Sequence, residues 1–199
     1  EKTPTVVVRD QNQRIIPESE YTVTYADEND NAVTKLIAVG KYTVTVTDKL
    51  GGNYEFTPPA MGSFEITPAG QNPLTIVTDK ATDVYYGETI RLSAMGGSGN
   101  GAIQWSIDDN NANVAVVTSS SGNNCVVTVT GTGGFSVKAY KAAVGGYSES
   151  NEDTVAFNAN PKPVTPVVTA ANKLYDGGLN ATLNAVWKSG DLVGSDEIE

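Results

Sequence analysis

The sequence predicts an all-β chain built from tandem β-sandwich domains, and three observations support that prediction. Val and Thr together number 46 of the 199 residues, whereas Leu numbers only 8, and β-branched side chains suit a pleated sheet better than a helix. Apolar and polar residues alternate in YTVTY (21–25) and KYTVTVT (41–47), as in strands buried on one face. Short runs of this kind recur between turn-forming clusters, which is typical of a β-sandwich.

The other strands are expected in chain order between those clusters. Glycine, asparagine, aspartate and serine gather in ADENDN, DKLGGN, GGSGNG, DDNNAN, SSSGNN and GTGG, which favours turns at these places. No segment shows the apolar stripe of a helix. The further predicted strands are residues 5–9, 63–67, 74–78, 90–94, 102–107, 114–118, 125–130, 135–140 and 154–158.

Two proline-containing stretches divide the chain into three predicted modules. TPAGQNP (67–73) and NPKPVTP (160–166) each follow one predicted strand and precede another, as linkers between domains do. The predicted modules are residues 1–70, 71–162 and 163–199. The last one is too short to bury a core of this kind, so we expect it to be the incomplete part of a third β module.

The composition argues against several classes of function. With 23 acidic and 13 basic residues the net charge is −10, so we expect neither nucleic acid nor an anionic membrane surface as partner. No apolar run is long enough to insert into a membrane. The chain has no histidine, the usual acid-base residue and metal ligand. It has one cysteine, Cys125, so no intrachain disulfide can form. We expect a non-catalytic chain without a resident cofactor.

The glycine-rich stretch GGSGNG (96–101) fits the glycine spacing of two phosphate-binding loops. A P-loop requires Lys and then Ser or Thr after its last glycine, whereas Ala102 and Ile103 follow here. A dinucleotide-binding loop requires a helix to begin there, whereas residues 103–107 alternate as a strand. We therefore interpret the stretch as a turn at one end of a sandwich.

Short motifs in the second module carry a family resemblance. They are Y-G-E-T at 86–89, L-S-A-M-G-G-S-G-N-G-A at 92–102, the strand with Trp105, and the ending K-A-A-V-G-G-Y at 141–147. Through them, residues 84–150 resemble the bacterial immunoglobulin-like (Big-type) repeats of exported surface proteins. In animal immunoglobulin domains the tryptophan packs on a disulfide, which the bacterial repeats lack. Trp105 and Cys125 are thus expected to be apolar core residues.

The flanking segments resemble related repeats. E-Y-T-V-T-Y (20–25), G-K-Y-T-V-T-V (40–46) and F-E-I-T-P-A (64–69) make the first module similar to the MBG type. L-Y-D-G-G (174–178) makes the C-terminal piece resemble the opening half of a YDG-type repeat. The resemblance implies tandem immunoglobulin-like β-sandwich domains, the last one incomplete, in an extracellular or bacterial cell-surface protein. It supplies no catalytic residues.

Two oxygen-rich clusters are candidate calcium sites, and calcium is the one possible cofactor. An EF-hand loop beginning at Asp27 would require Gly at position 32 and Glu at position 38, where Ala32 and Ala38 stand. Solvated turns are therefore the competing interpretation. The candidate ligands are Asp27, Asn29 and Asn31 in the first cluster, and Asp108, Asp109, Asn110 and Asn111 in the second.

Two other chemistries remain open. Trp187, Tyr85, Tyr86 and Tyr147 could line a sugar-binding face, although tyrosines also cap sandwich edges. Some Gram-positive surface domains close a Lys–Asn or Lys–Asp isopeptide bond, but no pair is marked in this sequence. Lysines such as those at 49, 80 and 188 are expected to be exposed at strand ends and turns.

The function predicted from these features is that of a non-catalytic structural spacer in a modular bacterial cell-surface or secreted protein, with a contribution to adhesion. The alternative is a carbohydrate- or matrix-binding module that uses sandwich-end loops, with GGSGNG and DDNNAN as candidates. The expected partners are neighbouring repeats of the same chain and a glycan or host-matrix protein. A monomer is expected.

Overall fold

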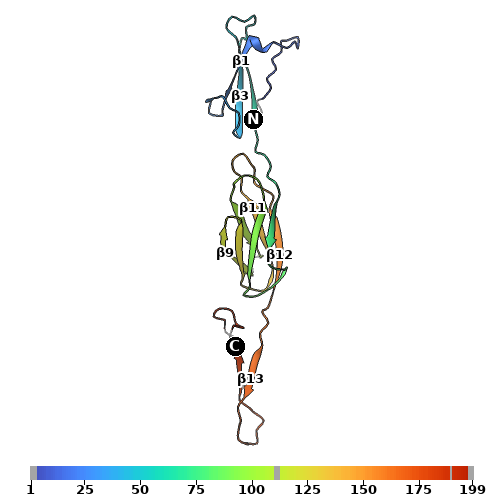
Figure 1. Cartoon of the computed structure of the whole chain (residues 1–199), viewed down its shortest axis with the longest axis vertical. Helices are drawn as coiled ribbons and strands as arrows, with labels where there is room; N and C mark the ends of the chain where they lie inside the picture. The colour runs from blue at the N-terminus through green and yellow to red at the C-terminus, as the bar shows by residue number, and fades with distance from the viewer. Residues whose placement is uncertain (1–3, 110–112, 189, 197–199) are drawn as a thin grey trace. The chain divides into compact units, whose positions relative to one another are not determined.

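The computed structural model describes residues 4–109, 113–188 and 190–196. Its contacts divide the chain into two units (Figure 1). Unit 1 comprises Glu1–Gly70 with Val144–Ser148, and unit 2 comprises Gln71–Ala143 with Glu149–Glu199. The first division follows Gly70, inside the first proline-containing stretch. The assignment of three modules stays a prediction.

Unit 1 contains one four-stranded antiparallel sheet in the order β2-β1-β3-β4. Pairing of Val23 with Val46 and of Tyr42 with Phe64 places apolar side chains on one face and threonines on the other, because side chains alternate along a strand. The elements are a 3-10 turn η1 (Glu18–Glu20), β1 (Tyr21–Ala26), β2 (Ala32–Val33), β3 (Gly40–Asp48) and β4 (Ala60–Ile66).

Irregular segments cover the apolar face of this sheet. Val6, Val8 and Ile16 pack with Val46 in one cluster. The prediction of a strand at residues 5–9 is wrong, because this segment forms only the isolated bridge from Arg9 to Ile15. It contributes apolar side chains to the core without a continuous hydrogen-bonded ladder.

Unit 2 contains a sandwich of two four-stranded sheets. One sheet has the order β5-β7-β10-β9 and the other β6-β12-β11-β8. These orders correspond to the ABED and CFG sheets of an immunoglobulin domain, with the first strand divided between the two sheets. The strands are β5 (Leu74–Thr78), β6 (Asp83–Tyr85), β7 (Thr89–Gly96), β8 (Ile103–Asp108), β9 (Ala115–Ser121), β10 (Asn124–Val129), β11 (Gly133–Lys141) and β12 (Asp153–Asn160). The all-β, immunoglobulin-like fold is confirmed.

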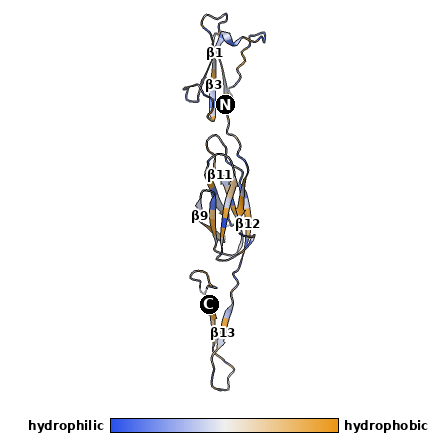
Figure 2. Cartoon of the chain, in the orientation of Figure 1, coloured by the Kyte–Doolittle hydropathy of each residue, from blue (hydrophilic) through white to orange (hydrophobic). Residues whose placement is uncertain are grey.

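The core lies between the two sheets, where alternate side chains of each strand meet. Ile90, Val127 and Val137 are completely buried, and Figure 2 shows the apolar residues concentrated on the sandwich strands. Cys125 is buried and unpaired, as expected, and burial raises the pKa of its thiol. Trp105 packs against the core from its margin, and its Nε1 has no hydrogen-bond acceptor in the described part of the chain.

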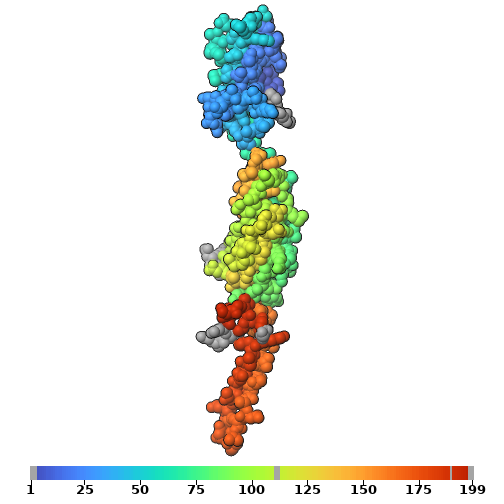
Figure 3. Space-filling model, turned by 60° about the vertical axis from the view of Figure 1, so that its left-hand side comes forward, coloured from blue at the N-terminus to red at the C-terminus, as the bar shows by residue number. Residues whose placement is uncertain are grey.

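The C-terminal part of unit 2 forms a two-stranded hairpin. β13 (Pro166–Ala170) pairs antiparallel with β14 (Leu183–Trp187). Figure 3 shows this hairpin, in orange and red, as a slim column, and Val168 and Leu183 are more than half exposed. A hairpin of this size buries little apolar surface and is marginally stable alone. Its membership in an incomplete third module stays a prediction.

Candidate functional site

Gly96 is the last residue of β7, and the rest of the GGSGNG stretch forms the loop between β7 and β8, so its interpretation as a turn is confirmed. Gly96, Gly97 and Gly99 have φ of +94°, +71° and +66°, a region that glycine adopts at little cost. A Cβ at Gly96 would overlap the carbonyl oxygen of Pro73. A Cβ at Gly97 would lie 2.6 Å from Cδ of Lys141. The loop backbone therefore packs closely against two other segments.

Gln71 connects this loop to the end of β11. Its Nε2 donates to the carbonyl oxygens of Lys141 at 3.3 Å and Ala142 at 3.2 Å, and its Oε1 accepts from the backbone N–H of Ser98 at 3.0 Å. The backbone N–H of Lys141 donates to Oγ of Ser150 at 2.8 Å. Lys141 is consequently held on both sides of its Cα.

A hollow of about 410 Å³ lies beside Lys141, between the GGSGNG loop and the turn from β9 to β10. The structure thus brings the loop singled out in the sequence together with a second turn, SSSGNN, and with a lysine that sequence reasoning missed. The polar side chains of its lining are Asn100, Ser120, Ser121, Asn123 and Lys141.

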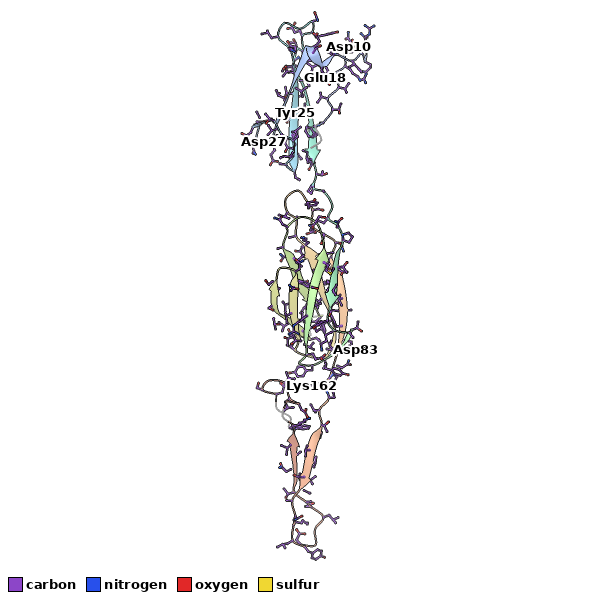
Figure 4. The ribbon with its side chains drawn as sticks, viewed as in Figure 1. Asp10, Glu18, Tyr25, Asp27, Asp83 and Lys162 are labelled. Carbon is purple, nitrogen blue, oxygen red and sulfur yellow. The ribbon has the colours of Figure 1, made fainter. Side chains whose placement is uncertain are left out.

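The first calcium candidate is a turn closed by its own hydrogen bonds. Asp27, labelled in Figure 4, directly follows β1. Its Oδ1 accepts from the backbone N–H of Asn29 and of Asn31, both at 2.9 Å, and Asn31 Nδ2 donates to both carboxylate oxygens. These bonds, that from the Asn31 backbone first, lower the pKa of Asp27. Asn31 presents amide hydrogens to Asp27, whereas calcium requires oxygen ligands.

The second calcium candidate is divided between different partners. Asp108 Oδ2 lies 3.2 Å from Nζ of Lys138, and Asp109 Oδ2 accepts from the backbone N–H of Val114 at 2.9 Å. Asn110 and Asn111 lie outside the described residues. Within residues 4–109, 113–188 and 190–196, no group of three or more His, Cys, Asp or Glu residues could hold a metal. The calcium hypothesis stays a prediction that the geometry does not favour.

Lys138 lies between two carboxylates, an arrangement that the sequence did not reveal. Its Nζ is 3.2 Å from Asp108 and 3.7 Å from Glu152, and the three side chains are 31%, 53% and 49% exposed. The hydrogen bond to Asp108 is the first cause of a raised Lys138 pKa. An isopeptide bond requires a neutral amine as nucleophile, and these carboxylates favour the protonated one. The arrangement is therefore a surface ion-pair network.

The four aromatic residues named as a sugar-binding face do not belong to one unit. Tyr147 is part of unit 1, whereas Tyr85, Tyr86 and Trp187 are part of unit 2. A hydrogen bond from Tyr86 to the Asp196 carboxylate raises the pKa of that tyrosine.

A second hollow in unit 2, of about 340 Å³, contains two carboxylates beside Lys162, which Figure 4 labels. Asp191 accepts from the backbone N–H of Thr165 at 3.4 Å, and Asp196 accepts from Tyr86. Lys162 Nζ donates to the carbonyl oxygen of Gly190 at 2.9 Å. Each of the two carboxylates accepts a hydrogen bond from the protein. We therefore interpret this hollow as a space left by the packing of residues 190–196, and not as a site with a catalytic acid and base.

The Lys80–Glu88 ion pair leads to a pH-dependent prediction. Glu88 Oε1 lies 2.8 Å from Lys80 Nζ, and Oε2 accepts from the Tyr85 backbone N–H at 3.0 Å. These contacts, that with Lys80 first, lower the Glu88 pKa. The stabilisation of the folded state by these contacts is complete above the ordinary glutamate pKa. It is lost as pH falls through the lowered pKa of Glu88. We expect Lys80→Met to raise the Glu88 pKa toward its ordinary value in a carbon-detected NMR titration.

The matched control is Lys35→Met, which removes the same charge from an exposed lysine of unit 1. It should leave the titration of Glu88 unchanged. An unaltered Glu88 pKa in Lys80→Met would show that the backbone hydrogen bond alone holds it down.

Comparison with known proteins gives structural likeness only. No protein-family model matches the chain, and no curated protein matches it at a significant level. Domains 4 and 5 of the S-layer protein SbsC are 16% identical, with 78% of this chain and 80% of that chain covered and a TM-score of 0.31. The mouse nectin-like molecule 4 ectodomain is 8% identical, with 72% and 56% covered and a TM-score of 0.34.

A third solved structure, cadherin domains 3–6 of protocadherin gamma B2, is 13% identical at a TM-score of 0.35, with 78% of this chain and 43% of that chain covered. The chain thus spans about half the length of the nectin-like and protocadherin chains. Likeness at these scores assigns no function. No helix of the described residues has the length and apolarity needed to cross a membrane.

Proposed function

We propose that this chain is a non-catalytic spacer segment of a modular, extracellular protein of the bacterial immunoglobulin-like repeat kind. The motifs at 86–89 and 92–102, the immunoglobulin-like strand order and the acidic composition support this proposal. Acidic surfaces keep such modules soluble and separate. Its partners are then other modules of the same polypeptide.

One observation carries the proposal: β6, the second part of the divided first strand, pairs in parallel with β12, the strand by which the chain leaves the sandwich. β6 pairs with β12, Asp83 opposite Asn158 and Tyr85 opposite Asn160. The Asn158 N–H donates to Thr82 at 2.8 Å, and the Tyr86 N–H donates to Asn160 at 2.9 Å. The other strand pairs of the two sandwich sheets are antiparallel.

Parallel pairing determines how the sandwich responds to tension. A pull on both ends of the chain reaches β6 through β5, which pairs antiparallel with β7, and it draws β6 toward its N-terminus and β12 toward its C-terminus. Because the two strands run the same way, these forces act in opposite directions along the strand axes. The hydrogen bonds between the strands are then loaded together rather than broken one after another. Such a connection suits a module that transmits force along an array.

The turn after β6 allows a precise test. The Glu88 N–H donates to the carbonyl oxygen of Tyr85 at 3.0 Å, and Gly87 has φ of +83°, which together define a type II turn with Tyr86 at its second position. Proline is favoured at that position. Tyr86→Pro therefore removes the N–H that donates to Asn160 without opposing the turn. Tyr86→Ala, the control, loses the same ring but keeps the N–H.

We expect Tyr86→Pro to lower the unfolding force of the sandwich below that of Tyr86→Ala, with the full chain held at its ends in single-molecule force spectroscopy. At equilibrium the two variants should differ by only about 1 kcal/mol, the net contribution of one hydrogen bond. Equal unfolding forces would show that the parallel pair does not bear the load, and would remove the main support for the spacer function.

A further inference from the structure

We propose that the hollow beside Lys141 binds a sugar that carries a carboxylate, of the uronic acid or sialic acid class. This inference goes beyond the spacer function, because it assigns a ligand to one end of the sandwich. Its basis is the combination in one hollow of an unpaired ammonium, several unpaired neutral side chains and no acidic residue.

The main chain of Lys141 is held in place by two neighbouring side chains. The carbonyl oxygen of Lys141 accepts from Gln71, and its N–H donates to Ser150. Its side chain passes the Cα of Gly97, where a Cβ would lie 2.6 Å from Cδ. The glycine therefore leaves the space that the lysine stem occupies. No carboxylate of the described residues forms an ion pair with the Lys141 ammonium, so this charge is available to a ligand.

The neutral groups of the hollow suit the hydroxyl groups of a sugar ring. They come from two turns, with Asn100 before β8 and Ser120, Ser121 and Asn123 around the turn from β9 to β10. Over the described part of the chain, these four side chains have no hydrogen-bond partner in the protein. Amides and hydroxyls both donate and accept hydrogen bonds, as recognition of sugar hydroxyls requires.

The charge and the volume of the hollow indicate which class of ligand it would bind. The chain has a net charge of −10, yet no aspartate or glutamate lines this hollow. The hollow is therefore a local positive site on an acidic protein, which favours an anionic group at Lys141. Its volume of about 410 Å³ lies within the usual range for small-molecule sites, about 300–1,000 Å³.

The test is a titration of the full chain with glucuronate, glucose, acetate and inorganic phosphate, followed by amide NMR shifts. We expect glucuronate to shift residues 100–103, 120–123 and 141, and to bind about tenfold more tightly than glucose or acetate. Such a factor corresponds to about 1.4 kcal/mol, close to the lower end of the range for a hydrogen bond to a charged group. Lys141→Gln should weaken glucuronate binding about tenfold, and Lys141→Arg should retain it.

Lys35→Gln, an equal charge change at an exposed site of unit 1, should leave binding unchanged. Unaltered tryptophan fluorescence in each variant would show that unit 2, which contains Trp105 and Trp187, remains folded. Equal binding of acetate or phosphate would reduce the hollow to a nonspecific anion site. If glucose bound as tightly as glucuronate, or if Lys141→Gln bound glucuronate as tightly as the unaltered chain, the Lys141 charge would have no part in binding. Each of these results overturns the proposal, while the force measurement on Tyr86 variants stays independent of it.

Discussion

Gly96→Ala should lower the free energy of unfolding of the sandwich by about 2–6 kcal/mol. The backbone at Gly96 has φ of +94°, a conformation that costs a residue with a side chain about 1–3 kcal/mol. The new methyl group would also overlap the carbonyl oxygen of Pro73, and relief of such a contact by backbone movement costs about 1–3 kcal/mol. A loss of this size is a large part of the stability of a typical domain, about 5–15 kcal/mol.

Gly122→Ala is the matched control, since Gly122 also has a positive φ, +56°, but has open space where its Cβ would be. Only the conformational cost remains there, about 1–2 kcal/mol. Guanidinium unfolding followed by tryptophan fluorescence reports on unit 2, which contains both tryptophans, Trp105 and Trp187. If both variants lost the same stability, the close approach of Pro73 would contribute nothing.

Gly96 illustrates what can and what cannot be predicted from the sequence alone. The glycines identified GGSGNG as a turn because positive φ angles are a local property. The specific need for glycine at position 96 depends on Pro73, which belongs to the strand entry that lies against the loop. A single sequence contains no sign of that contact. Local patterns thus predicted the turn but could not say which glycine is indispensable.

The strands likewise could be predicted where local alternation was sufficient, and not where pairing depends on a distant partner. Alternation in residues 41–47 and 125–130 was sufficient to predict β3 and β10. Residues 5–9 have the same β-branched composition but form no ladder, because pairing depends on a partner strand as well as on propensity. β6, only three residues long, was missed because it is too short to show a period.

The candidate site could be predicted only in part. GGSGNG was a ligand-loop candidate from its sequence, and it does line the hollow. Lys141 and the turn around Ser121 were not associated with it, because the three segments meet only through the sandwich topology. Lys138 was likewise overlooked, since its carboxylate partners come from β8 and from the residue before β12.

Phe135→Ala should cost the sandwich about 3–5 kcal/mol, the range for removal of a buried phenylalanine. Phe135 of β11 is 3% exposed and pairs directly with Phe157 of β12, with ring centroids 5.3 Å apart and planes at 20°. The two rings connect the central strand of the sheet to the strand that leaves the sandwich. Thr154→Ala, at an exposed position of β12, should change stability by less than about 0.5 kcal/mol.

A double-mutant cycle separates ring stacking from simple burial. Phe135→Ala and Phe157→Ala should be coupled by about 0.5–1.5 kcal/mol, as expected for an aromatic pair. Each single variant also leaves a cavity beside the other ring, so Phe135→Leu, which refills part of that space, should recover part of the loss. A coupling near zero would mean that each ring stabilises the core through its own contacts alone. Strand β12 would then be held by its two backbone ladders, to β11 and to β6, and the Tyr86→Pro variant would become the more sensitive probe of how the sandwich resists tension.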